Sequence, residues 1–144
     1  MNYRFQEITL QHDELMMVTD RLSLILDAPP DRLSDDRLRK LIDYEIGFLY
    51  ETLSEHFLFE EMDGYLSEAL DKMPSISVQA EFLRNEHAEI RNALLKLKKQ
   101  SAQMSTSELR QALRELLGKL ADHERAEREI MNAISLETPA GSTG

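Results

Sequence analysis

The chain has 144 residues, a length typical of one domain with a substantial core. Its 27 Asp and Glu outnumber its 17 Lys and Arg, and the net charge of −10 argues against nucleic acid or an anionic membrane as a partner. Because it has no cysteine, disulfides, thiolate metal sites, iron–sulfur clusters and cysteine nucleophiles are excluded.

The first two predicted helices are separated by a pair of prolines. The first helix spans about residues 5–27 and ends before residues 29–30, which are both Pro and cannot continue a helix. The second spans about residues 34–70, with Ser34 as its N-cap and Gly64 as a bend or break. The pattern therefore predicts an antiparallel helix pair with a short connection.

The third predicted helix spans about residues 77–99, and the fourth spans about residues 106–135. Ser105 begins a capping box, in which a Ser and a Glu three residues later cap each other's backbone N–H groups. We expect residues 1–137 to form one domain and residues 138–144 to be a disordered tail. Four helices with short connections predict an all-α, up-down-up-down four-helix bundle.

Each predicted helix carries one stripe of apolar residues at alternating spacings of four and three, the pattern of a helix face that lies against a bundle core. Each stripe also carries one of the four histidines of the chain, where Leu or Ile would be expected. The stripes are Ile8, His12, Leu15, Thr19, Leu22 and Leu26; Ile42, Ile46, Leu49, Leu53, His56 and Glu60; Leu83, His87, Ile90, Leu94 and Leu97; and Leu109, Leu113, Leu116, Leu120, His123, Glu127, Ile130 and Ile134.

Two of these histidines are followed by a glutamate four residues later, His56 by Glu60 and His123 by Glu127. Residues four apart lie on one helix face, so each pair can direct an imidazole and a carboxylate at one point. Measured from the end with the first and third connections, three histidines lie roughly 24–26 Å along the bundle and His56 roughly 33 Å. An irregular first turn of the second helix would bring all four into one layer.

A histidine among apolar residues is most often a core residue with a satisfied hydrogen bond. Two buried glutamates change this interpretation, because an ionised carboxylate in a core is costly unless it is paired or binds a metal. No Lys or Arg occupies the stripes, so the sequence predicts a metal site. Imidazole and carboxylate without thiolate favour iron or manganese, with zinc as a further alternative. Two shared carboxylates in a four-helix bundle are typical of di-metal sites.

Four short blocks resemble the hemerythrin-type (HHE) cation-binding domain: residues 10–15, 56–61, 85–90 and 123–127. The resemblance covers about residues 5–135. It implies a non-haem di-iron centre, with coordination positions left open for an oxo or hydroxo bridge, water or an external ligand. Carried over by position, it implies these metal ligands: His12 and His56 on one iron, His87 and His123 on the other, and Glu60 and Glu127 as bridges.

Two positions depart from the oxygen-carrying hemerythrins. Their third helix has a second histidine where this chain has Arg91, and their last helix has its acidic bridge where this chain has Arg128. The four-residue spacing to Glu127 is similar to that of the iron-centre repair proteins and of the iron-sensing domain of an F-box protein. The repair proteins have a further histidine near residues 32–33, which are Arg and Leu here. The resemblance therefore assigns neither oxygen transport nor repair to this chain.

An open centre of this kind predicts binding of, or reaction with, a small oxidant (O₂, peroxide or NO) by a sensor, scavenger or peroxidase-like protein. The sequence leaves open whether there is enzyme activity of peroxidase, catalase or oxidase type. An iron-responsive regulatory module and a metal-free helical adaptor are the alternatives. Glu61, Glu86 and Glu124 are interpreted as surface charges or additional ligands. Asp122 and Glu86 are also interpreted as groups that orient an imidazole or as surface charges. Met16, Met17 and Met104 are interpreted as core residues.

The chain has no run of 18 apolar residues, and its N-terminus lacks the apolar stretch of a signal peptide. We therefore expect a cytoplasmic protein that contacts neither membrane nor nucleic acid. Its expected partner is a small ligand, and the sequence identifies no protein partner.

Overall fold

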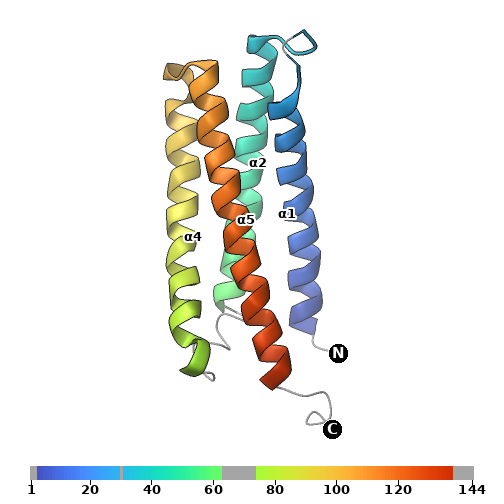
Figure 1. Ribbon diagram of the computed structural model, residues 1–144, viewed down its shortest axis with the longest axis vertical. Coiled ribbons are helices and arrows are strands. Elements are labelled where there is room, and N and C mark those ends of the chain that lie inside the picture. The colour runs from blue at the N-terminus through green and yellow to red at the C-terminus, as the bar shows by residue number, and fades with distance from the viewer. Residues whose placement is uncertain (1–2, 30, 63–73, 138–144) are drawn as a thin grey trace.

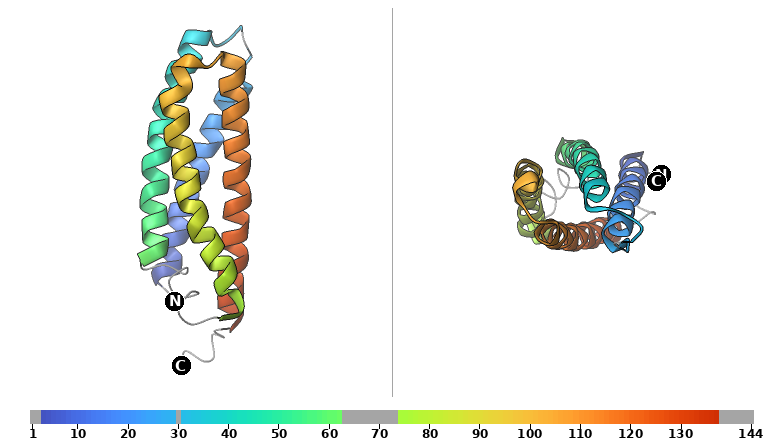
Figure 2. Two further views of the ribbon diagram at one scale, coloured as in Figure 1. Left: turned by 90° about the vertical axis from the view of Figure 1, so that its left-hand side faces the viewer. Right: turned by 90° about the horizontal axis from the view of Figure 1, so that it is seen from above.

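The computed structural model describes the backbone of residues 3–29, 31–62 and 74–137, and the side chains of residues 10–29, 31–62 and 74–134. This part of the chain contains no strand and consists of α1 (Tyr3–Asp27), α2 (Asp35–Met62), α4 (Pro74–Gln100), the 3₁₀ helix η1 (Ser101–Gln103) and α5 (Thr106–Glu137). Successive long helices run in opposite directions (Figure 1). Seen from above, the four long helices are arranged side by side around a common interior (Figure 2). The predicted all-α, up-down-up-down bundle is confirmed.

Local sequence explains where the helices begin. Ser34 caps α2, because its Oγ accepts a hydrogen bond from the backbone N–H of Arg37 at 3.3 Å. The predicted capping box of α5 is confirmed: Ser105 Oγ accepts from the Glu108 N–H at 3.1 Å, and the Glu108 carboxylate accepts from the Ser105 N–H at 2.9 Å. These bonds hold the pKa of Glu108 below its usual value. Pro74 opens α4, where its missing N–H removes no helical bond.

The start of α2 corrects one expectation about the level of His56. No irregular first turn is present, since α2 is a continuous helix from Asp35 onward. Instead, α2 begins above the level at which α1 ends (Figure 1). This offset accounts for the greater number of helical residues that separate His56 from the start of its helix. The predicted continuation of this helix to residue 70, the bend at Gly64 and the tail at residues 138–144 lie outside the described residues.

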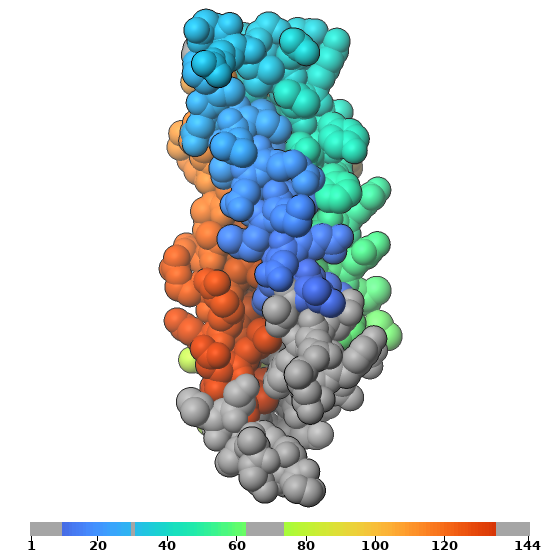
Figure 3. Space-filling view, turned by 90° about the vertical axis from the view of Figure 1, so that its right-hand side faces the viewer, coloured from blue at the N-terminus to red at the C-terminus, as the bar shows by residue number. Residues whose placement is uncertain are grey.

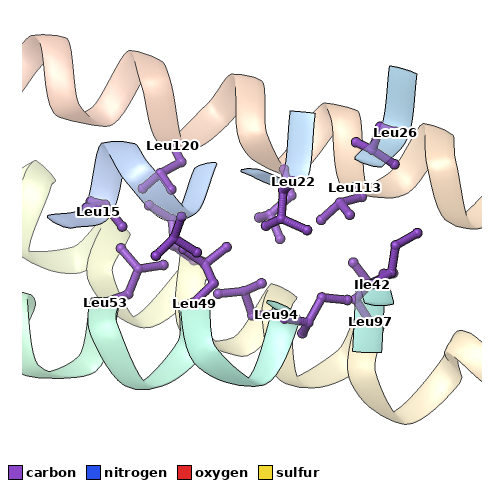
Figure 4. Close-up of a cluster of buried hydrophobic side chains, with 14 of the residues drawn as sticks. Leu15, Leu22, Leu26, Ile42, Leu49, Leu53, Leu94, Leu97, Leu113 and Leu120 are labelled. Atoms are coloured by element: carbon purple, nitrogen blue, oxygen red, sulfur yellow. The ribbon is translucent and has the colours of Figure 1, made fainter. Parts of the chain in front are cut away.

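The apolar core consists of two clusters on either side of a polar layer. The larger cluster fills the half of the bundle near the connection between α1 and α2, where leucines from all four long helices point toward one another (Figure 4). The smaller cluster comprises Ala80, Leu83, Ile130 and Ile134 of α4 and α5. Each fully buried Leu or Ile stabilises the fold by about 1.5–3 kcal/mol. None of the described helices is long and apolar enough to cross a membrane.

The predicted stripes are buried with few exceptions. On α1, Val18 is buried and Thr19 is only half-buried. The Thr19 hydroxyl donates to the backbone carbonyl of Met16 at 3.0 Å. The interpretation of Met16 and Met17 as core residues is wrong, since they are 51% and 61% exposed. Ile8 lies outside the described side chains.

Candidate metal centre

The four histidines come from four helices and meet in one layer between the two apolar clusters. The ring centroids of His12 and His56 are 4.6 Å apart, and those of His87 and His123 are 5.0 Å apart. His56, His87 and His123 are buried, whereas His12 is half-buried. The layer expected from the sequence is thus present, although α2 reaches it in a different way from the one predicted.

Two acidic residues hold the rings of the α4 and α5 histidines. His87 Nδ1 lies 2.9 Å from Glu61 Oε2, and His123 Nδ1 lies 2.8 Å from Glu86 Oε1. In each case Nδ1–H donates to the carboxylate, which leaves Nε2 as the nitrogen that faces the layer. The interpretation of Glu86 as a group that orients an imidazole agrees with this contact, and Glu61 has the same role. The same interpretation of Asp122 is wrong, because its exposed carboxylate pairs with Arg125 at 3.3 Å.

Sequence reasoning missed the residue that holds the third ring. His56 Nδ1 lies 2.8 Å from Gln11 Oε1, a side chain that comes from α1. Gln11 directly precedes His12 in the chain, so adjacency to a predicted ligand was the only signal available. That signal does not say which neighbouring helix a side chain will reach.

Glu127 lies at the centre of the layer with one oxygen toward each histidine pair. Its Oε1 lies 2.5 Å from His123 Nε2 and 4.0 Å from His87 Nε2. Its Oε2 lies 3.6 Å from His12 Nε2 and 3.8 Å from His56 Nε2. The side chain is fully buried. A carboxylate in this position can share its two oxygens between two cations.

Glu60 also lies between the pairs. Its Oε1 is 3.3 Å from His56 Nε2 and 3.5 Å from His87 Nε2, one histidine of each pair. Like Glu127, Glu60 is fully buried. The structure therefore brings together all six residues that the sequence analysis selected as metal ligands.

Electrostatics in the layer are strongly perturbed. Burial lowers the pKa of His87 to about 4, although the contact with Glu61 opposes this shift. Burial also disfavours charged His12, but Glu124 and Glu127 outweigh it and raise the pKa of His12 to about 9. Burial favours neutral Glu127, yet its contacts with Glu60 and the histidines hold its pKa well below the usual value. The neighbouring carboxylates thus favour the protonated form of His12, whereas burial favours the neutral form of His87.

The donor set fits a pair of metal ions. The buried Nε2 atoms of all four histidines and both oxygens of Glu127 have no hydrogen-bond partner within the described part of the chain. Ligand atoms about 2.1 Å from a cation lie roughly 3 Å apart when adjacent and about 4 Å apart when opposite, which matches the separations found here. Two groups have ligand atoms within 4.8 Å of one another: His12, His56, Glu60 and Glu127, and His87, His123 and Glu127.

The two sides of the layer differ in their access to solvent. On the α4 side, the fully buried ring of Phe57 stacks on His87 at 3.8 Å and 3°, and meets His123 edge-on at 5.5 Å. On the α1 side, the side chains of His12 and Glu124 are 14% and 12% exposed. They border a groove of about 560 Å³ between α1 and α5. Within the described residues, His12 is thus the histidine of the layer that is open to solvent, since the side chains of the other three are 1% exposed or less.

Comparison with known proteins gives one match. The family model described as Hemerythrin HHE cation binding domain matches residues 3–134, which include all four histidines and both central glutamates. No curated protein and no solved structure matches the chain.

Proposed function

This chain belongs to the hemerythrin HHE cation-binding domain family, and we propose that it holds a pair of iron ions that bind or react with a small oxidant (O₂, peroxide or NO). The observation that carries the proposal is the position of Glu127. One of its oxygens faces the His12 and His56 pair, and the other faces His87 and His123. Such a carboxylate is suited to bridge two cations in a four-helix bundle.

In this proposal His12 and His56 bind one ion, and His87 and His123 bind the other. Glu127 would be shared between the two ions, and so would Glu60, which lies against one histidine of each pair. Carboxylate or amide oxygens accept hydrogen bonds from the outer ring nitrogens of three imidazoles. These bonds fix the orientation of the rings and raise their basicity as ligands.

Imidazole and carboxylate donors without sulfur suit iron and manganese, with zinc as a third candidate. When bound, iron supplies the electrons that a small oxidant accepts. The protein residues do the rest: Phe57 and the apolar clusters exclude water from the His87 side, and the groove beside His12 admits a ligand from the other side. We propose an oxo or hydroxo bridge between the ions in the oxidised protein.

The test is to express the chain with added iron, purify it without chelators and record its metal content and absorption spectrum. We expect iron as the main metal, charge-transfer absorption when the protein is oxidised, and loss of this absorption after chelation. A colourless chain that binds no iron would contradict the proposal and favour a metal-free adaptor.

Peroxide consumption then separates a reactive centre from an iron-responsive regulatory module. A reactive centre consumes peroxide faster than the same amount of free iron. A regulatory module binds iron without consuming peroxide. Iron changes its unfolding temperature, and peroxide does not.

A further inference from the structure

The groove between α1 and α5 runs alongside the metal layer. Figure 3 shows the face of the molecule on which α1 lies beside α5. Of the groove residues, two belong to the layer itself, His12 of α1 and Glu124 of α5. The remaining lining includes exposed charged residues such as Asp20 and Arg128, and apolar residues such as Met131 and Leu117. Glu124 is thus both a groove residue and a neighbour of the histidines.

Glu124 contacts the histidines through their inward nitrogens. Its Oε2 lies 3.0 Å from His12 Nε2, and its Oε1 lies 3.9 Å from His56 Nε2. Glu61 and Glu86 behave differently, because they contact the outer Nδ1 nitrogens and so only orient the rings. Of these three acids, Glu124 is the one that lies where a metal ligand would lie.

The oxygen of Glu124 nearer to His56 is buried and has no hydrogen-bond partner within the described residues. An ion pair with protonated His12 would use the other oxygen and would leave this one unsatisfied, which is unfavourable for a buried carboxylate. A cation held by His12 and His56 would lie within reach of it. The helix geometry agrees, because Glu124 is three residues before Glu127 and shares its side of α5.

We propose that Glu124 is a terminal ligand of the metal ion held by His12 and His56, and that an external anion reaches this ion through the α1–α5 groove when the carboxylate moves aside. The proposal rests on the proposed function, since it needs the metal pair. It adds that the two ions differ: one has two imidazoles and three carboxylates, and the other has two imidazoles and two carboxylates.

The experiment compares iron-loaded wild type with Glu124→Ala and Glu124→Gln, and uses azide as the probe anion. Asp20→Asn is the matched control, because Asp20 is exposed and lines the same groove away from the layer. The measurements are iron per chain, the Mössbauer spectrum of the reduced protein, and the azide dissociation constant from absorption titration.

We expect two distinct iron environments in wild type and in Asp20→Asn. In Glu124→Ala one environment changes while the other is retained. If Glu124 occupies its position about nine-tenths of the time, its removal tightens azide binding about tenfold. Loss of one iron in Glu124→Ala, with two retained in Glu124→Gln, also supports a ligand role.

If both Glu124 variants bind two irons and have the spectra and azide affinity of wild type, Glu124 is not a metal ligand. That result leaves the proposed function intact. Loss of both irons in Glu124→Ala and in Glu124→Gln likewise overturns a terminal-ligand role, because a ligand of one ion cannot control both. Wild-type protein that binds no iron pair overturns the proposed function itself, and this proposal with it.

Discussion

Glu45 and Glu127 are both buried glutamates, but they lie in different regions of the bundle and have different partners. Glu45 lies beside the leucine-rich cluster and accepts hydrogen bonds from Arg21 Nε at 3.2 Å and a terminal Arg21 nitrogen at 3.1 Å. The ion-pair partners of Glu127 within the described residues are all histidines. A guanidinium satisfies a carboxylate without any metal, whereas an imidazole that already carries its proton on Nδ1 can donate to Glu127 through Nε2 only when the ring is also protonated there. Burial of a glutamate is therefore not by itself a sign of a metal site. The residue type of its partners distinguishes a metal site from an ordinary ion pair.

The same contrast extends to the larger apolar cluster and the polar layer. The larger apolar cluster contributes to folding whether or not a metal is present. The polar layer between the clusters places carboxylates and imidazoles in a dry environment, which opposes folding until a cation compensates them. The larger cluster should therefore control stability, and the polar layer should control metal content.

The largest expected effect is on stability, in the variant Leu94→Ala. Leu94 is fully buried in the larger cluster, and such a truncation lowers the free energy of unfolding by about 2–5 kcal/mol. We expect iron content per folded chain to stay at the wild-type value. His87→Ala should do the reverse and abolish the two-iron state with a smaller loss of metal-free stability.

Urea unfolding in the presence of chelator and metal analysis of the folded fraction measure both quantities. Full iron loading of His87→Ala would mean that the assignment of His87 as a ligand is wrong. Iron loss from folded Leu94→Ala would mean that the larger cluster and the polar layer do not act independently.

The second effect comes from replacement of the polar layer as a whole. A chain with Leu at the five buried positions His56, Glu60, His87, His123 and Glu127 should bind no metal. Replacement of buried charged groups by apolar residues of similar volume is often stabilising by about 1–4 kcal/mol, so this chain should be more stable than metal-free wild type. The measurement is urea unfolding of both proteins in chelator, and lower stability of the substituted chain would show that the layer does not oppose folding.

The third effect is stabilisation by the metal itself. Ligand binding to the folded state alone raises the free energy of unfolding by about 2.7 kcal/mol at a free metal concentration of 100 times the dissociation constant. Thermal unfolding of wild type with iron and with chelator should therefore differ, whereas the chain with five leucines should unfold at one temperature in both. If wild type unfolds at the same temperature with iron and with chelator, the metal does not bind within the folded core.

The smallest effect is expected from the groups that orient the rings. Glu86→Ala removes the acceptor for His123 Nδ1 and should weaken metal binding by about 10- to 100-fold. Glu89→Ala is the matched control, because Glu89 is exposed on the same helix and pairs with Lys119 at 3.2 Å. Competition titration with a chelator measures the affinities for the metal. Equal affinities of the two variants would mean that Glu86 does not contribute to metal binding.

The sequence was sufficient for the parts of the molecule that follow from helical periodicity. The bundle, the capping box at Ser105 and the position of four histidines in one layer depend on spacing along single helices, and the structure agrees with them. The level of His56 was explained wrongly, because it depends on how the connection between α1 and α2 is arranged in space. Met16 was wrongly assigned to the core. It is an apolar residue next to the stripe, and its apolar character alone does not show whether its side chain faces the core or the solvent.

The supporting residues of the site were harder to predict for the same reason. Whether Gln11, Glu61 or Glu124 faces an outer or an inner ring nitrogen depends on side-chain direction across two helices, and spacing along one helix does not fix it. Glu61, Glu86 and Glu124 look alike in the sequence, since each is adjacent to a predicted ligand. Their different contacts appear only when the helices are packed together.

Native mass spectrometry of wild-type chain, produced with added iron and kept in its folded state, tests the central claim most directly. The claim is that the two histidine pairs and the glutamates between them hold two metal ions. We expect a mass that corresponds to about two iron ions per chain, as in other carboxylate-bridged bundles, and a return to the bare mass after chelation. A folded chain that carries at most one metal ion with iron in excess would contradict the account.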